Sequence, residues 1–295
     1  MYDIVTIGNP LFIHKDDRYL LSGPSVYSAT TATKLGIEQQ ALVSAVGSDM
    51  TNDFIQSLGT LGIPEYYIVE DKKPRTVHHG VDNTAPIDLL MFPQKLGIRD
   101  IPEEFLRAQA ILLSPSLQEI DSELIEWICN SSDALLVLDP QLHTIDAKGR
   151  LSVIEDLNLT EKTQCFLDII QTNEKEALLI TGESDPYVSA ELLVEWAAEM
   201  CIVTMGEKGS LIYDGNDFLI IPPYSTNTND EIGAGSIYLT GFVSQYISGK
   251  TLSECGAFGS SLASIKVEND RLDFQVKQND ILQRYEIISE SIKIR

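Results

Sequence analysis

The sequence predicts an α/β fold built around a mostly parallel sheet, and two observations carry this prediction. Short apolar segments alternate with helical segments at a spacing of roughly 20 residues, as in successive βαβ units. Most of the apolar segments are continuous and do not alternate with polar residues, which is typical of strands that are buried on both faces. With 295 residues, 43% of them hydrophobic, the chain is long enough to bury a large core.

Local signals place the elements of this fold in order. Strands are expected at residues 4–8, 41–46, 110–114, 134–138, 165–170 and 201–204, with a hairpin over 210–221. Helices are expected at residues 25–35, 51–61, 122–129, 190–200 and 253–267, with a short one from 174 to 181 and a last one from about 278. Gly36, Gly62 and Gly182 follow three of these helices and can end them in a left-handed conformation. Asp121 can cap the helix that begins at residue 122.

Two segments depart from the α/β alternation. Residues 11–22 form a candidate hairpin, and residues 65–92 contain three short segments that are typical of antiparallel strands. Together they predict a small sheet beside the main domain, which we call the lid because it would lie over a site. We find neither an internal repeat nor a linker, so a single domain over residues 1–295 is expected.

Composition excludes some classes of partner. Lys and Arg number 21 against 44 Asp and Glu, a net charge of −23, which disfavours nucleic acid and anionic membranes. The four cysteines stand in apolar segments without a C-x-x-C pair, which indicates reduced thiols and a cytoplasmic protein. The first residues lack the pattern of a signal peptide, and no run of about 18 apolar residues predicts a membrane span.

The segment at residues 229–242 is the strongest candidate for a binding site. Gly233, Ala234 and Gly235 lack bulk, so a ligand can approach the backbone closely, and a helix is expected to follow them. The N–H groups in the first turn of that helix have no internal partner and would form an anion hole for a phosphoryl group. Taken alone, the same three residues also fit an ordinary tight loop.

Further polar residues follow the other strands, at the edge of the sheet where parallel folds bind ligands. Asn173 and Glu176 stand three apart at a helix start, so they suit either Mg²⁺ and its waters or a helix cap. Gly206 and Gly209 suit either a close approach to a nucleotide or a β-turn. Asp139 follows the strand at residues 134–138.

The order and spacing of these motifs resemble those of the ribokinase-like PfkB family of carbohydrate and nucleoside kinases over essentially the whole chain. The resemblance rests on Gly23, on the segments at residues 34–36, 46–49, 58–63 and 138–141, on N-x-x-E at 173–176, on the segment at 203–209 and on D-x-x-G-A-G at 230–235. It implies a three-layer α/β/α ribokinase-like fold with a small β-sheet lid. It also implies phosphoryl transfer from ATP, with Mg²⁺, to a sugar, polyol or nucleoside held under the lid. Lids of this family often pair two chains, which leaves a homodimer open.

The resemblance also implies roles for individual residues. Gly233, Ala234 and Gly235 match the anion hole, and Asp230 matches the first aspartate of the last motif. Asn173 and Glu176 match the positions that serve Mg²⁺ and its waters. The positions that match the nucleotide side are Thr204, Gly206 and Gly209, and those assigned to the acceptor side are Asn9, Ile13, Gly23, Tyr27 and Asp139.

The chain departs from the family pattern at the acceptor side. Ser236 stands where the family has the aspartate that acts as general base, and losing such a base costs roughly 10²–10⁴ in rate. Ile13 stands where the family has an acidic sugar ligand, and Tyr27 replaces a common asparagine. Phe12, Ile13 and Tyr27 predict a more apolar ligand than a plain hexose or ribose. The short connection between residue 8 and Gly23 predicts a reduced lid.

These departures leave two interpretations open. The chain is a kinase that uses another base, such as Asp230, Asp139 or a water. Alternatively, it is a non-catalytic pseudokinase that binds a nucleotide or metabolite as a regulator, because Ser236 replaces the base.

Overall fold

The computed structural model describes residues 1–15, 18–48, 50–71, 75–79, 87–91, 95–117, 119–141, 143–145, 151–153 and 167–295. Asp49, Cys165 and residues 16–17 of the candidate hairpin lie outside these ranges. The central feature is a sheet in which the described residues form ten strands. In spatial order these are β16 (Lys293–Ile294), β15 (Phe218–Ile221), β14 (Ser210–Tyr213), β13 (Ala198–Thr204), β12 (Leu167–Asn173), β9 (Leu135–Leu138), β8 (Ala110–Leu113), β1 (Ile4–Ile7), β4 (Gln40–Gly47) and β5 (Tyr66–Asp71).

The run of the central sheet from β13 to β5 is parallel throughout, so all of its strands end at the same edge. Among the ten described strands of this sheet, only the outer strands β14, β15 and β16 pair antiparallel. This confirms the predicted α/β class with a mostly parallel sheet. It also brings together the residues that follow β9, β12 and β13, although these lie far apart in the sequence.

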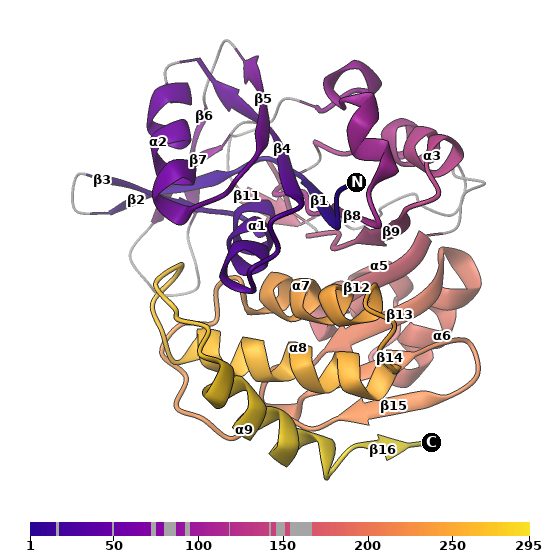
Figure 1. The fold of residues 1–295 in the computed structure, drawn as a ribbon. Coiled ribbons are helices and arrows are strands. Elements are labelled where there is room, and N and C mark those ends of the chain that lie inside the picture. Colours follow the sequence, from indigo (N-terminus) through magenta and orange to yellow (C-terminus); the bar gives the residue numbers. More distant parts are fainter. Residues whose placement is uncertain are drawn as a thin grey trace.

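Helices cover both faces of this sheet (Figure 1). They are α1 (Pro24–Lys34), α2 (Thr51–Leu61), α3 (Ser122–Ser131), α5 (Glu174–Thr181), α6 (Pro186–Trp196), α7 (Ala234–Tyr246), α8 (Leu252–Val267) and α9 (Gln278–Ser289). Short 3₁₀ turns occur at η1 (Ile98–Asp100), η2 (Glu103–Arg107) and η3 (Gly206–Lys208).

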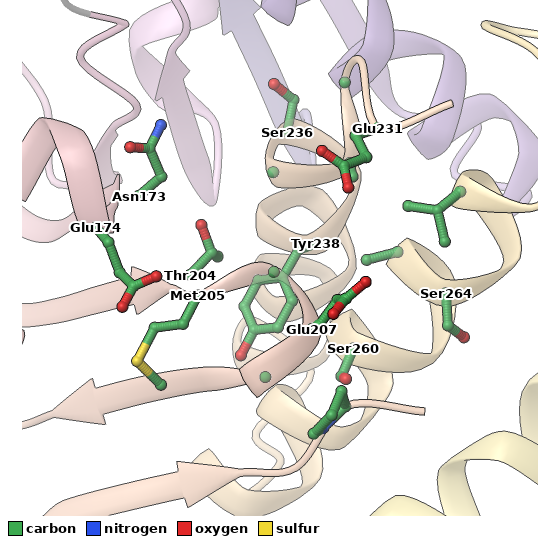
Figure 2. Close-up of a pocket in the computed structure, with 18 of the residues that line it drawn as sticks. Asn173, Glu174, Thr204, Met205, Glu207, Glu231, Ser236, Tyr238, Ser260 and Ser264 are labelled. Carbon is green, nitrogen blue, oxygen red and sulfur yellow. The ribbon is translucent and has the colours of Figure 1, made fainter. Parts of the chain in front are cut away.

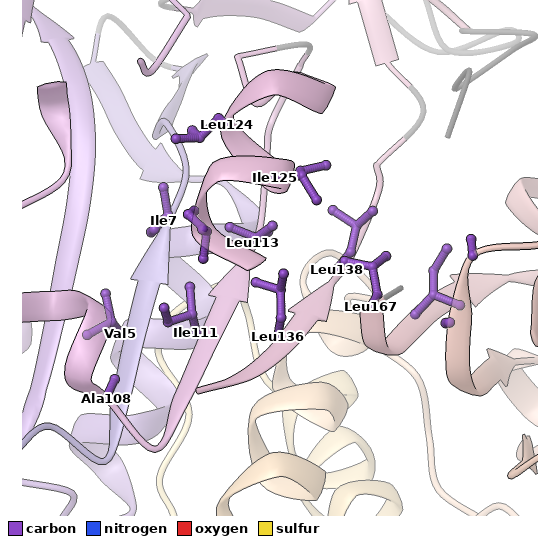
Figure 3. Close-up of a cluster of buried hydrophobic side chains, with 14 of the residues drawn as sticks. Val5, Ile7, Ala108, Ile111, Leu113, Leu124, Ile125, Leu136, Leu138 and Leu167 are labelled. Atoms are coloured by element: carbon purple, nitrogen blue, oxygen red, sulfur yellow. The ribbon is translucent and has the colours of Figure 1, made fainter. Parts of the chain in front are cut away.

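Alternate strand residues supply the two cores, because neighbouring side chains of a strand point to opposite faces. Ile111 and Leu113 of β8 pack with α3, as Figure 3 shows beside Leu124 and Ile125. Leu112, between them, belongs to the opposite core with α7 and α8. Continuous apolar strands are therefore required here, as the sequence indicates.

The small antiparallel sheet consists of β3 (Arg18–Ser22), β2 (Leu11–Lys15), β7 (Ile87–Met91) and β6 (Arg75–His79). Of the three strand segments expected in residues 65–92, the first, at residues 66–69, is wrongly assigned to this sheet, because β5 pairs in parallel with β4 at the edge of the central sheet. Its position at the edge leaves Tyr66 37% and Tyr67 43% exposed, so its pattern resembles that of a half-buried lid strand. A separate pair joins β10 (His143–Ile145) to β11 (Leu151–Val153).

Several local predictions agree with the structure. Gly62 and Gly182 adopt the left-handed conformation after α2 and α5, and the Asp121 side chain accepts the N–H of Leu124 at 3.1 Å. The helix expected at 190–200 instead begins at Pro186 and ends at Trp196, and β13 already begins at Ala198.

The cysteines are not all reduced, contrary to the sequence prediction. Cys129 forms a disulfide, whereas Cys201 and Cys255 are free and buried. No helix among the described ranges has the length and apolar character needed to cross a membrane.

Candidate active site

A cleft of about 950 Å³ opens at the carboxyl ends of the parallel strands. Its walls come from the ends of β9, β12 and β13, the loop before α7, the first turn of α7 and one face of α8. Figure 2 shows Asn173 and Glu174 across the cleft from Ser264, with Ser236 at the start of α7. The cleft therefore lies where open α/β sheets bind ligands.

The predicted anion hole lies in this cleft. Gly233 is the left-handed residue before α7, with φ of 84°, and the first intrahelical bond runs from the N–H of Ile237 to the Gly233 carbonyl at 3.0 Å. The N–H groups of Gly235 and Ser236 precede that bond, so the helix offers them no acceptor. The Gln171 side chain on β12 donates to the Gly235 carbonyl at 3.0 Å and fixes the loop to the sheet.

Tyr27 lies beneath this loop and not on the wall of the cleft. Its ring is 1% exposed, and a Cβ added to Gly233 would lie 2.5 Å from ring carbons of Tyr27. Burial raises the pKa of the Tyr27 phenol to about 12. The placement of Tyr27 on the acceptor side therefore has to be corrected: its ring belongs to the core cluster with Ile237 and Phe274 and supports the anion hole from below.

Asp230 has a structural role and does not line the cleft. The ammonium of Lys266, a fully buried side chain, lies 3.0 Å from Oδ2 of Asp230, and the N–H groups of Ile232 and Arg271 bind its two carboxylate oxygens. Burial raises the pKa of this carboxyl, but these N–H groups and the ammonium outweigh it and hold the pKa below its ordinary value. Such a carboxylate is a poor proton acceptor, which argues against Asp230 as the replacement base.

Asn173 and Glu176 form a reciprocal helix cap at the start of α5. The Asn173 side chain accepts the N–H groups of Lys175 and Glu176, each at 2.9 Å, and Glu176 Oε2 accepts the N–H of Asn173 at 2.9 Å. Both residues also line the cleft. The cap thus holds both side chains at the cleft wall, so the structural and the functional interpretations of this motif are compatible.

Two buried carboxyl groups lie close to each other at the base of the cleft. Burial raises the pKa of Asp139 to about 6, although Gln141 and Ser236 donate hydrogen bonds to it. Burial, together with the charge of Asp139, raises the pKa of Glu176 to about 7. This part of the cleft favours a bound cation or proton, because two ionised carboxylates there repel each other.

These raised values predict how stability depends on pH. In the folded chain both groups hold protons that the unfolded chain releases, so their contribution to stability is complete below about pH 4 and is lost as pH rises to about 7. We expect the melting temperature of the wild-type chain to fall relative to that of Asp139→Asn over this range. Thermal unfolding at intervals of half a pH unit measures the difference, and parallel curves would contradict it.

The three residues predicted for the nucleotide side lie together in the cleft. Thr204, Gly206 and Gly209 all line the cleft. A Cβ on Gly209, whose φ is 92°, would lie 2.1 Å from the Ile221 carbonyl oxygen, so this turn requires glycine. The opposite wall is a face of α8 that the sequence analysis did not assign. It consists of small or branched residues at helical spacing: Ser260, Ala263, Ser264 and Val267. The high content of alanine and serine in this helix was the sequence feature that could have indicated this wall of the cleft.

The remaining acceptor-side residues lie outside this cleft. Asn9 is buried, and its side-chain oxygen accepts the N–H of Ala45 at 2.8 Å. Ile13 is 7% exposed on β2, and Phe12 beside it packs edge-on against Phe54. The expectation of an apolar ligand rested on Phe12, Ile13 and Tyr27. Phe12 and Tyr27 are core residues, so they no longer argue for it. Gly23 is the residue before α1, with φ of 113°.

The fold and the cleft together define a class. A parallel α/β domain with a helix N-terminus facing a cleft, and a small antiparallel sheet beside it, is typical of proteins that bind phosphorylated ligands. The model of the pfkB family of carbohydrate kinases matches residues 23–277, and the chain belongs to this family.

Individual relatives agree with this assignment. The chain is 28% identical over 269 residues to the cytidine kinase of Thermococcus kodakarensis, covering 88% of this chain and 94% of that protein. It is 24% identical to the nucleoside kinase of Methanocaldococcus jannaschii, covering 85% and 80% respectively. The structure of ribokinase from Thermotoga maritima is similar with a TM-score of 0.74 at 21% identity, covering 97% of this chain and all of that one, which confirms the ribokinase-like fold.

Proposed function

We propose that the protein transfers a phosphoryl group from ATP to a hydroxyl group of a sugar or nucleoside. The observation that carries the proposal is the first turn of α7, where the N–H groups of Gly235 and Ser236 have no helical acceptor and both residues line the cleft. Backbone N–H groups in this position hold a transferred phosphoryl group and stabilise its charge. The face of α8 gives room for the nucleotide of the donor. The names of the two curated relatives favour a nucleoside as the acceptor.

A divalent cation fits the base of this cleft. Glu176 is a buried carboxyl with a raised pKa at the wall of the cleft, and hard oxygen ligands of this kind suit Mg²⁺. Among the described residues no group of three or more acidic, histidine or cysteine side chains could hold a metal alone. We therefore assign Asn173 and Glu176 to orienting Mg²⁺ through its waters. A bound Mg²⁺ would neutralise charge on the donor phosphates, and Asn173 and Glu176 would orient its waters.

Glu176→Gln should weaken Mg²⁺-dependent ATP binding about 10–100-fold, because the amide keeps the helix cap but loses the charge. Titration of Mg²⁺ against a fixed ATP concentration, followed by thermal shift, measures the change. Glu254→Gln is the matched control, since Glu254 caps α8 by accepting the N–H of Thr251 at 2.8 Å away from the cleft. An unchanged Mg²⁺ dependence in Glu176→Gln would remove the assigned role.

The proposed function is tested by binding and turnover together. ATP with Mg²⁺ should raise the melting temperature, and ADP should be released with at least one acceptor from a panel that begins with nucleosides and continues with sugars and polyols. ATP binding without turnover on any acceptor would contradict the kinase and support the pseudokinase interpretation.

A further inference from the structure

Ser236 and Asp139 form a side-chain hydrogen bond at the bottom of the cleft, although 97 positions separate them in the sequence. The Ser236 hydroxyl in the first turn of α7 donates to Oδ2 of Asp139 at 3.1 Å, at the carboxyl end of β9. Gln141 Nε2 donates to the other oxygen of Asp139 at 3.0 Å. Both Ser236 and Asp139 are only 2% exposed, and both line the cleft. The carboxylate is therefore held in one orientation by two neutral donors.

The position of this pair matters because the anion hole is part of the same turn. Ser236 contributes one of the two N–H groups that have no helical acceptor. A hydroxyl that attacks a phosphoryl group held there comes close to the Ser236 side chain. A serine by itself does not hold a proton taken from an alcohol, since the two groups have similar acidity. A carboxylate hydrogen-bonded to the serine can take the proton, and the Ser236 hydroxyl already donates to Oδ2 of Asp139.

We propose that Ser236 and Asp139 act as a proton relay that replaces the missing general base. The acceptor hydroxyl gives its proton to Ser236 Oγ while the hydroxyl proton of Ser236 passes to Asp139 Oδ2. The acceptor oxygen bonds to the transferred phosphorus, the bond from that phosphorus to the bridging oxygen of ATP breaks, and ADP leaves. Asp139 then returns its proton to Ser236 as Ser236 releases one to water. The relay rests on the proposed kinase function.

A hydrogen bond from a serine also satisfies a buried carboxylate without any catalytic role. The charge of Asp139 raises the pKa of Glu176, which belongs to the proposed Mg²⁺ site, so a pH profile alone would not separate the two roles. The comparison of Ser236→Ala, Asp139→Asn and the double variant separates them, because two residues of one relay are not additive.

The test measures kcat and KM with the acceptor of highest turnover. Each single variant should lower kcat by about 10²–10⁴, with KM for ATP changed less than about threefold, and the double variant should be no slower than the slower single variant. Ser244→Ala is the control, because Ser244 is a buried serine of the same helix whose hydroxyl donates to the Gly241 carbonyl. Wild-type kcat in Ser236→Ala, or additive losses in the double variant, would overturn the relay.

A bypass variant gives a second, independent test. Ser236→Asp puts a carboxylate within the same turn, so Asp139→Asn should cost at least tenfold less in this background than in the wild-type chain. An equal cost in both backgrounds would overturn the relay. If Asp139→Asn does not fold, Ser236→Ala alone decides. A wild-type chain without turnover on any acceptor overturns both proposals, whereas turnover that is indifferent to Ser236 and Asp139 overturns only the relay.

Discussion

Replacing Lys266 with methionine should lower the free energy of unfolding by about 3–5 kcal/mol, because the substitution leaves a largely buried carboxylate without its cation. The Lys266 side chain is fully buried and that of Asp230 is 13% exposed. The ammonium also binds the Asp230 carbonyl at 2.9 Å and the Asn269 carbonyl at 3.3 Å. Urea or guanidinium unfolding of both chains measures the loss.

Two controls separate charge from packing. Lys266→Met combined with Asp230→Asn removes the uncompensated charge and should recover part of the lost stability. Lys95→Met removes an ion pair of the same 3.0 Å length whose lysine side chain is 66% exposed, and it should cost less than about 1 kcal/mol. Equal losses of stability for Lys266→Met and Lys95→Met would show that burial does not determine how much the Lys266–Asp230 ion pair contributes to stability.

The Lys266 variant should also weaken ATP binding, because Asp230 begins the loop that leads to the anion hole. The carboxylate accepts the N–H of Ile232 at 3.0 Å, directly before Gly233. ATP binding that survives the loss of stability unchanged would show that the loop keeps its shape without the ammonium.

Gly233→Ala should remove most ATP binding and destabilise the chain by about 2–5 kcal/mol, the sum of a left-handed alanine and an overpacked contact. The added Cβ would lie 2.5–2.6 Å from three ring carbons of Tyr27, so the loop or the buried ring must move. Either movement displaces the N–H groups of Gly235 and Ser236. Calorimetric ATP titration and thermal unfolding measure the two effects.

Gly249→Ala is the matched control for this prediction. Gly249 has φ of 76°, and a Cβ there would meet no atom within 4 Å, so this variant carries the backbone strain without the clash. The difference between the two variants measures the contact with Tyr27. Tyr27→Leu in the Gly233→Ala background should restore part of the stability. If both alanine variants behave alike, the ring does not constrain the loop.

Much of the fold was predictable because its signals are local. The apolar run of β8 predicts a strand with two buried faces, and Gly62 after α2 predicts a left-handed helix end. The wrong assignment of β5 to the small sheet arose because strand pairing is not a local signal. The sequence at residues 66–71 does form a strand. Its pairing partner, β4, is set by how the chain packs in three dimensions, and no local sequence pattern encodes that.

The candidate site divides in the same way. The glycines at 233 and 235, the N-x-x-E cap and the turn at Gly209 are local features, since each depends on backbone conformation or on neighbours a few residues away. For this reason the sequence alone determined the α/β class, the family resemblance and the place of the glycine turn that is proposed as the anion hole. Tertiary contacts decided the role of each neighbouring side chain. Asp230 is bound by Lys266, Tyr27 lies beneath Gly233, and Ser236 meets Asp139 across 97 residues, because packing brings α7, α8, α1 and β9 together.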